Sequence, residues 1–212
     1  FKALSDETRL RLAYVLGRYE LSVNELVSIL EMGQSRVSRH LKILTEAGLL
    51  ASRRDGLWVF YSAVTEGEGA AFLRAAMPFL DEDADMRADV DMAAKIIEDR
   101  ALKTRQFFNT IAEHWDTLSR EVLGGFDLAG AVCAVMPEGC EAAVDLGCGT
   151  GLVLERMRGR ARQIIGVDGS PRMLELSRRR LAGAEEEGIS LRIGELSHLP
   201  LRDGEADFAS IN

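Results

Sequence analysis

Three glycines at alternate positions, Gly147, Gly149 and Gly151, follow an apolar stretch and precede a helical pattern. Because glycine has no Cβ, such a loop lets a ligand approach the backbone and lets the next helix pack closely. A second apolar stretch ends about 20 residues later at Asp168, the spacing at which a carboxylate can accept hydrogen bonds from ribose hydroxyls. Glycine loop and acid together predict a site for a nucleoside ligand.

The glycine spacing separates this site from two other nucleotide sites. A dinucleotide fingerprint reads GxGxxG, whereas residues 144–151 read VDLGCGTG, with Asp145 ahead of the first glycine. The lysine of a phosphate-binding P-loop is also missing from this run.

The elements around this loop alternate between strand and helix, which predicts a parallel, Rossmann-like sheet with helices on its faces. Strands are expected at residues 142–146, 163–167, 190–193 and 206–211, and helices at 152–158 and 171–184.

A second kind of chemistry is indicated near the N-terminus, where residues 22–50 have helix-turn-helix spacing. The apolar Val37, Leu41 and Leu44 face inward, so the polar side chains of that helix face outward. Such side chains reach base edges and phosphates in a major groove, and a basic hairpin tip can touch the flanking backbone or the minor groove. The candidate DNA-binding residues are Gln34, Ser35, Arg36, Ser38, Arg39, His40, Lys42, Arg53 and Arg54. For His40, packing or capping is the use of the ring that we favour over a ligand role.

Three helices followed by a hairpin position these residues. Helices are expected at 5–16, 22–30 and 35–47, the second opening with a capping box from Ser22 to Glu25. Asp55-Gly56 stands between two β-prone runs, which is a strong hairpin signal. The pattern predicts an α+β winged helix-turn-helix domain. Further helices are expected at 70–80, regular up to Pro78, and at 86–105 and 107–119.

Charge and cysteine content limit the class of protein. The 212 residues carry a net charge of −8, but residues 1–64 are net +2, so a locally basic head can approach phosphate. Three cysteines, Cys133, Cys140 and Cys148, suit a reducing cytoplasm and buried packing, and their spacing is not that of a zinc site. No apolar run is long enough to span a bilayer, and no signal peptide is visible.

The first 64 residues resemble the ArsR-type winged-helix regulators. The matching runs are LSDETRL at 4–10, SRVSRHLK at 35–42, AGL at 47–49 and RDG at 54–56. The resemblance implies a homodimer on a palindromic DNA operator, usually a repressor released by a signal, with dimerisation through the first helix and the helix at 70–80. Metal-sensing members carry cysteines in the second helix, where this chain reads ELVSIL, so we expect no metal site.

Residues 107–212 resemble class I S-adenosylmethionine-dependent methyltransferases. The runs that carry this are VDLGCGTG, DGSPRML at 168–174, GEL at 194–196, LPL at 199–201 and Asp207-Phe208. The resemblance implies a cofactor site for S-adenosylmethionine or S-adenosylhomocysteine. Its residues would be Asp145, Gly147, Cys148, Gly149, Gly151, Asp168, Gly169, Ser170, Met173, Glu195 and Leu196.

Within that set the resemblance implies separate roles. Gly147 and Gly149 would line the methionine part, Asp168 would bind the ribose, and Met173, Glu195 and Leu196 would frame the adenine. The family usually has Asp where Glu195 stands. Phe107-Phe108, Ala112 and His114-Trp115-Asp116 resemble a lid helix over the cofactor, and ordinary core packing is the alternative.

Together these patterns predict a winged helix-turn-helix domain at 1–64, a helical dimerisation or linker region at 65–105, and a partial methyltransferase domain at 106–212. The class I fold has seven strands and this chain reaches the fourth, so we expect the natural polypeptide to continue and residues 1–212 alone not to catalyse methyl transfer. The leading hypothesis is a transcriptional regulator that senses one of the two nucleosides. An active methyltransferase with a DNA-binding head and a domain serving only as a dimer scaffold are the alternatives. No general base is evident, and Asn212 is a candidate acceptor-side residue.

Overall fold

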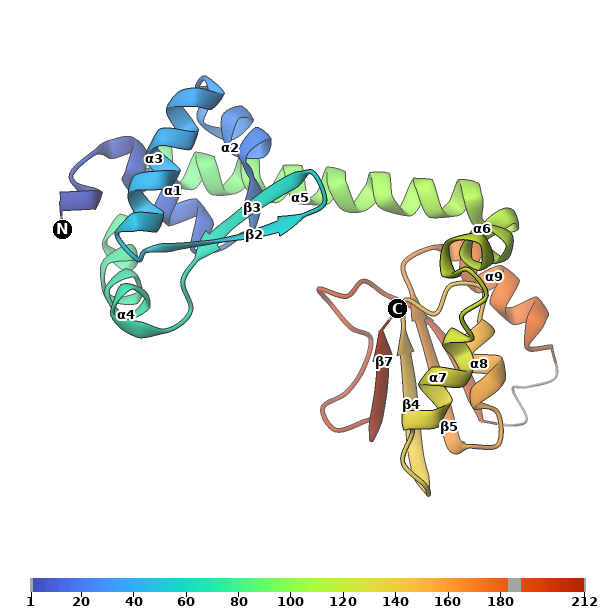
Figure 1. Cartoon of the computed structure of the whole chain (residues 1–212). Helices are drawn as coiled ribbons and strands as arrows, with labels where there is room; N and C mark the ends of the chain where they lie inside the picture. The colour runs from blue at the N-terminus through green and yellow to red at the C-terminus, as the bar shows by residue number, and fades with distance from the viewer. Residues whose placement is uncertain (1, 183–187, 212) are drawn as a thin grey trace. The chain divides into compact units, whose positions relative to one another are not determined.

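The computed structural model describes residues 2–182 and 188–211, which divide into two compact units (Figure 1). The N-terminal unit comprises residues 1–100 and the C-terminal unit residues 101–212. Asn212, the candidate acceptor-side residue, lies outside the described residues, as do the last two positions of the helix expected at 171–184.

The N-terminal unit is a winged helix. Its elements are η1 (Lys2–Leu4), α1 (Glu7–Leu16), β1 (Leu21–Ser22), α2 (Val23–Leu30), α3 (Gln34–Glu46), β2 (Leu50–Asp55), β3 (Trp58–Ala63), α4 (Gly67–Ala76), η2 (Met77–Leu80) and the first part of α5 (Ala84–Ile111). The antiparallel sheet has the order β1-β3-β2, and β1, only two residues long, was not predicted. The predicted hairpin is confirmed, with Gly56 and Leu57 as its two loop residues.

Local side-chain bonds start the helices where the sequence predicts them. Asp6 caps α1 by accepting a hydrogen bond from the amide of Arg9. Ser22 and Glu25 form the predicted capping box of α2, each side chain bonding the other residue's backbone N–H. The inward-facing Val37, Leu41 and Leu44 of α3 are fully buried in the core of this unit.

Several helix boundaries differ from the predictions: the helix expected at 171–184 ends early, at Arg180, and the one expected at 107–119 ends late, at Leu123. The helix expected at 70–80 ends as α4 at Ala76 and continues as the 3-10 turn η2, because Pro78 cannot donate a backbone hydrogen bond. The expected break near residue 105 is absent, and α5 runs unbroken to Ile111. No glycine or proline stands between Arg105 and Ile111 to interrupt it.

A buried ion pair fixes the first half of α5 against α1. The Arg11 guanidinium donates two hydrogen bonds of 2.7 Å to the carboxylate of Asp89, which is 3% exposed. Paired, two-point hydrogen bonding satisfies a carboxylate that would be costly to bury alone.

The C-terminal unit is the predicted parallel sheet. After η3 (Ala112–His114), its elements are α6 (Trp115–Leu123), α7 (Leu128–Val135), β4 (Cys140–Leu146), α8 (Leu152–Met157), β5 (Ala161–Asp168), α9 (Pro171–Arg180), β6 (Ile189–Ile193) and β7 (Phe208–Ile211). The strand order is β6-β5-β4-β7, with every neighbouring pair parallel. Helix α7 was not predicted.

Alternate residues of the strands serve two cores. Ala143 and Ile164 face the side covered by α7, α8 and α9. Val144 and Ile165 face the other side, against Leu201 of the connection between β6 and β7. Because β4 and β5 pair in parallel, their carboxyl ends lie side by side (Figure 1). The glycine loop and Asp168, which follow these two ends, therefore meet there.

Candidate nucleic-acid interface and cofactor site

Helix α3 presents a polar face to solvent, and its opposite side is anchored in the core by buried leucines. Every predicted outward residue except one is exposed, namely Gln34, Ser35, Arg36, Ser38, Arg39 and Lys42. Because the opposite side of the helix is fully buried, this face has a fixed direction and carries three cations and three neutral polar groups. The arrangement suits contacts to phosphates and base edges.

His40 is the exception. Its side chain is 12% exposed, and its Nδ1 lies 3.7 Å from Oδ1 of Asp6, the residue that caps α1. The ring therefore packs between α3 and the start of α1 rather than facing outward, which corrects its grouping with the outward residues.

Arg53 and Arg54 in the wing have different surroundings. The guanidinium of Arg53 donates to both carboxylate oxygens of Glu20, at 3.1 and 2.9 Å, and stacks 5.2 Å from the ring centre of Phe60. These hydrogen bonds lower the pKa of Glu20, so the pair is charged at neutral pH. The exposed Arg54 bonds only the carbonyl of Gly56 among the described residues and is the freer cation of the wing.

In the C-terminal unit, the glycine loop turns sharply from β4 to α8. Gly147, Gly149 and Gly151 take φ angles of 78°, 52° and 84°, the left-handed region that other residues adopt at a cost. The amides of Gly147 and Cys148 both donate to the carbonyl of Val167, at 2.8 and 3.0 Å. The loop is thereby held against the end of β5.

Asp168 joins the loop to the next turn. Its Oδ2 accepts a 2.9 Å hydrogen bond from the amide of Gly149, and its Oδ1 accepts one of 2.8 Å from the amide of Ser170. Each oxygen keeps a second lone pair, which suits a carboxylate that also accepts from a ribose diol. Gly169 approaches the third loop, because a Cβ there would lie 3.6 Å from the carbonyl oxygen of Gly194. Three loops predicted to share one ligand therefore converge.

Three of the predicted cofactor residues are buried and support the loops by packing or hydrogen bonding. The carboxylate of Asp145 is buried and accepts a 2.6 Å hydrogen bond from the hydroxyl of Ser210 in β7. The thiol of Cys148 packs beside Gly166, and burial raises its pKa. Met173 is buried under the turn. Ser210 was not predicted, because a single serine in a strand has no pattern that marks it.

The third loop is more open. Leu196 is exposed, and the half-exposed Glu195 forms an ion pair with Arg105, near the end of α5. This partner was not predicted either, since it lies 90 residues away in the chain.

Replacing Gly151 by alanine is expected to destabilise the C-terminal unit by about 2 kcal/mol or more. The left-handed φ opposes a side chain, and the new Cβ would lie 2.4 Å from Oγ of the buried Ser177. Gly159→Ala is the matched control, because Gly159 also has a positive φ, 72°, but open space around it. Urea unfolding of both variants separates the effect of packing from that of backbone strain. Equal losses in the free energy of unfolding would show that the contact with Ser177 is unimportant.

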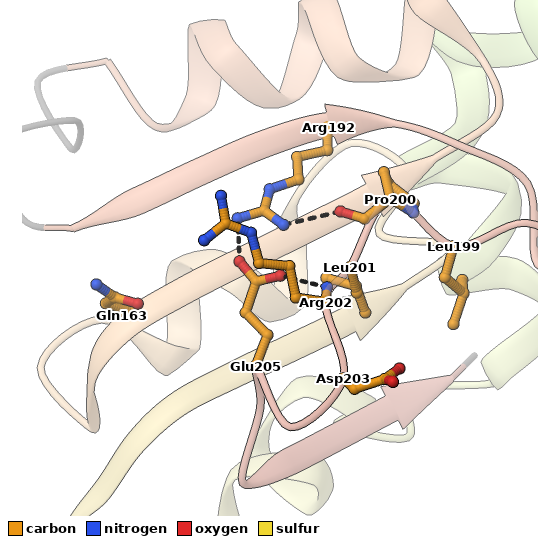
Figure 2. A pocket seen from close by; sticks show the side chains of 8 residues that line it. All are labelled: Gln163, Arg192, Leu199, Pro200, Leu201, Arg202, Asp203 and Glu205. Carbon is orange, nitrogen blue, oxygen red and sulfur yellow. Dashed lines mark hydrogen bonds and ion pairs between the residues drawn. The ribbon is translucent and has the colours of Figure 1, made fainter.

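A separate pocket of about 810 Å³ lies away from the glycine loop (Figure 2). Its lining comprises Gln163, Arg192, Leu199, Pro200, Leu201, Arg202, Asp203 and Glu205. Arg192 donates to Glu205 at 2.6 Å and to the carbonyl of Pro200 at 2.8 Å, and the bonds from Arg192 and the Arg202 amide lower the pKa of Glu205 to about 2. The Arg192 charge is thus neutralised within the wall.

Comparison with known proteins matches a part of each unit to a family. Residues 6–52 match the family described as bacterial regulatory protein, arsR family, and residues 144–212 match a family described as methyltransferase domain. Among the residues that the structure describes, no helix is long and apolar enough to cross a membrane.

The similar proteins fall into two groups. The arsenic resistance transcriptional regulator ArsR1 of Pseudomonas putida is 50% identical over 62 residues, which are 29% of this chain and 48% of that protein. The demethylmenaquinone methyltransferase of Thermobifida fusca is 32% identical over 108 residues, 50% of this chain and 46% of that protein. A solved structure of HlyU from Vibrio cholerae is 37% identical and covers 37% of this chain and 84% of its own, with a TM-score of 0.34.

The chain spans about half the length of the two curated relatives. The two groups match different parts of it, as the two family matches do. The chain therefore joins an arsR-family helix-turn-helix domain to a Rossmann-like methyltransferase domain.

Proposed function

We propose that this protein is a DNA-binding transcriptional regulator whose methyltransferase-like domain binds S-adenosylmethionine or S-adenosylhomocysteine as a signal. The observation that carries the proposal is the Asp168 carboxylate, which links the glycine loop to Ser170 in a chain whose other domain matches a regulator family. The regulator is a cytoplasmic repressor that binds a palindromic operator as a homodimer.

The DNA is read by the exposed face of α3. Arg36 and Arg39 supply charge and forked donors, which suit guanine edges and phosphates, and Gln34 suits an adenine edge. Arg54 contributes from the wing. Arg53 holds the wing against Glu20, so its part in DNA binding is to shape the hairpin.

The nucleoside is held where the three loops converge. Asp168 accepts hydrogen bonds from the ribose hydroxyls, Gly147 and Gly149 leave room for the amino-acid part, and Glu195 and Leu196 surround the adenine. The residues present fit this ligand. Gly149 adopts a positive φ and places no side chain in the loop, and Asp168 retains acceptor capacity beside it. When bound, the sulfonium form would also supply a transferable methyl group.

Ligand and operator affect each other by linkage. A nucleoside that binds one conformation of the protein better must shift the affinity for DNA, and DNA must shift the affinity for the nucleoside by the same factor. Helix α5 is the element suited to this coupling, because it is continuous and carries residues of both units.

Isothermal titration calorimetry of both nucleosides on the full-length protein tests the ligand assignment. We expect saturable binding of at least one nucleoside, and the absence of heat for both would leave a dimer scaffold as the better account. Turnover of methyl-labelled cofactor in the same preparation, with an acceptor, would instead favour an active methyltransferase carrying a DNA-binding head.

A further inference from the structure

One short segment contacts all three loops of the candidate cofactor site. Residues 105–116, called the strap below, comprise the end of α5, η3 and the start of α6. Its Arg105 pairs with Glu195, the Oδ1 of its Asn109 accepts from the hydroxyl of Ser170 at 2.6 Å, and its Asp116 accepts from the hydroxyl of Thr150 at 2.5 Å. The strap is therefore bonded to each loop by a different side chain.

The indole of Trp115 covers the middle of the glycine loop. A Cβ on Gly149 would lie 3.4 Å from Nε1 of Trp115, so the ring is in contact distance of the space that the glycine leaves open. Phe108 meets Trp115 edge to face, with ring centres 5.4 Å apart, and packs against the indole. The ring therefore lies directly beside the glycine whose open backbone the proposed ligand needs.

Asp116 fixes this indole from the next position in the chain. Besides Thr150, it pairs with the guanidinium of Arg180 in α9, and Arg180 also donates to the carbonyl and hydroxyl of Thr150, at 3.1 and 3.0 Å. Although burial opposes ionisation, hydrogen bonds from Thr150 and Arg180 lower the pKa of Asp116. The three residues form a closed cluster with Thr150 buried at its centre.

We propose that Asp116 is a positioning residue that controls access to the nucleoside site: its cluster with Thr150 and Arg180 keeps Trp115 on the glycine loop, and the ligand enters and leaves only when the cluster opens. The inference rests on the proposed nucleoside site. In this proposal the cluster closes the site both with and without ligand, so weakening it changes the rates of exchange more than the affinity.

Asp116→Asn tests this, because it preserves shape and an acceptor for Thr150 but removes the charge that pairs with Arg180. Stopped-flow binding of S-adenosylhomocysteine to the full-length protein should show both the association and dissociation rate constants raised about fivefold, as expected for a pair worth roughly 1 kcal/mol, with Kd changed less than twofold. Adding Arg180→Gln to Asp116→Asn should raise the rates little further, because the two substitutions break one interaction.

Glu141→Gln is the matched control, since Glu141 forms an exposed pair with Arg162 outside the strap, and it should leave both rates unchanged. A rise in dissociation alone would make Asp116 a ligand contact or a structural residue and overturn the proposal, as would unchanged rates.

A second readout needs no ligand. In a Trp58→Phe background, Trp115 is the one remaining tryptophan of residues 1–212, and acrylamide should quench it more strongly once Asp116→Asn is added. Equal quenching would contradict a strap held closed by Asp116. If the wild-type protein binds neither nucleoside, the proposed function fails, whereas the quenching result still decides whether Asp116 holds Trp115 in place.

Discussion

Replacing Arg36 and Arg39 together by alanine should weaken operator binding at least about 30-fold, because each arginine that contacts a base or phosphate contributes about 1–3 kcal/mol. Both side chains are exposed on α3, and the helix is anchored by Val37, Leu41 and Leu44. The fold should therefore persist while affinity falls. Fluorescence anisotropy with an operator selected from random duplexes, at fixed salt, measures the loss.

Arg87→Ala is the matched control for that experiment. Arg87 is an exposed arginine of the same unit that pairs with Glu82, away from the helix-turn-helix. It should leave affinity within about twofold, since exposed pairs contribute at most about 1 kcal/mol to stability and this one touches no DNA in the proposal. If the double variant bound as tightly as Arg87→Ala, α3 would not be the recognition helix.

Asp168→Ala should abolish measurable nucleoside binding, a loss of about 100-fold or more, because hydrogen bonds to a charged acceptor are worth about 1.5–3 kcal/mol each and a ribose diol donates two. The substitution also leaves the amides of Gly149 and Ser170 without their acceptor, so the two loops lose their common anchor. Calorimetry with each nucleoside measures the effect.

Asp203→Ala, at the exposed rim of the separate pocket, controls for the loss of one negative charge from the same unit and should bind normally. The nucleoside affinity of Asp168→Asn should fall between those of Asp168→Ala and Asp203→Ala, since the amide retains one acceptor oxygen. Normal binding by Asp168→Ala would remove the nucleoside site from this position.

Local patterns predicted the parts of the fold that local physics determines. The Ser22–Glu25 capping box, the spacing of Val37, Leu41 and Leu44, and the hairpin at Asp55-Gly56 each involve residues a few positions apart, and the structure confirms them. The glycine loop beside Asp168 was predictable for the same reason, because a strand end, a loop and a helix start leave a readable spacing.

Features that depend on distant partners were not predictable. Nothing near Arg53 indicates Glu20, and nothing near Asp116 indicates Arg180, since each pair is made by the fold. The two-residue β1 is too short for a periodic signal, and α5 was cut short because the aromatic pattern after Arg105 suggested a new helix. His40 lies among the outward residues in the sequence, but its ring packs against Asp6 at the start of α1.

The central claim is that DNA and nucleoside affinities are linked through one protein. Operator affinity of the full-length protein at zero and saturating S-adenosylmethionine or S-adenosylhomocysteine, paired with nucleoside affinity with and without operator, tests it directly. We expect at least one nucleoside to change operator affinity by a factor of about 5 to 150, and the operator to change that nucleoside's affinity by the same factor. Operator affinity that stays constant while both nucleosides saturate their site would contradict the account.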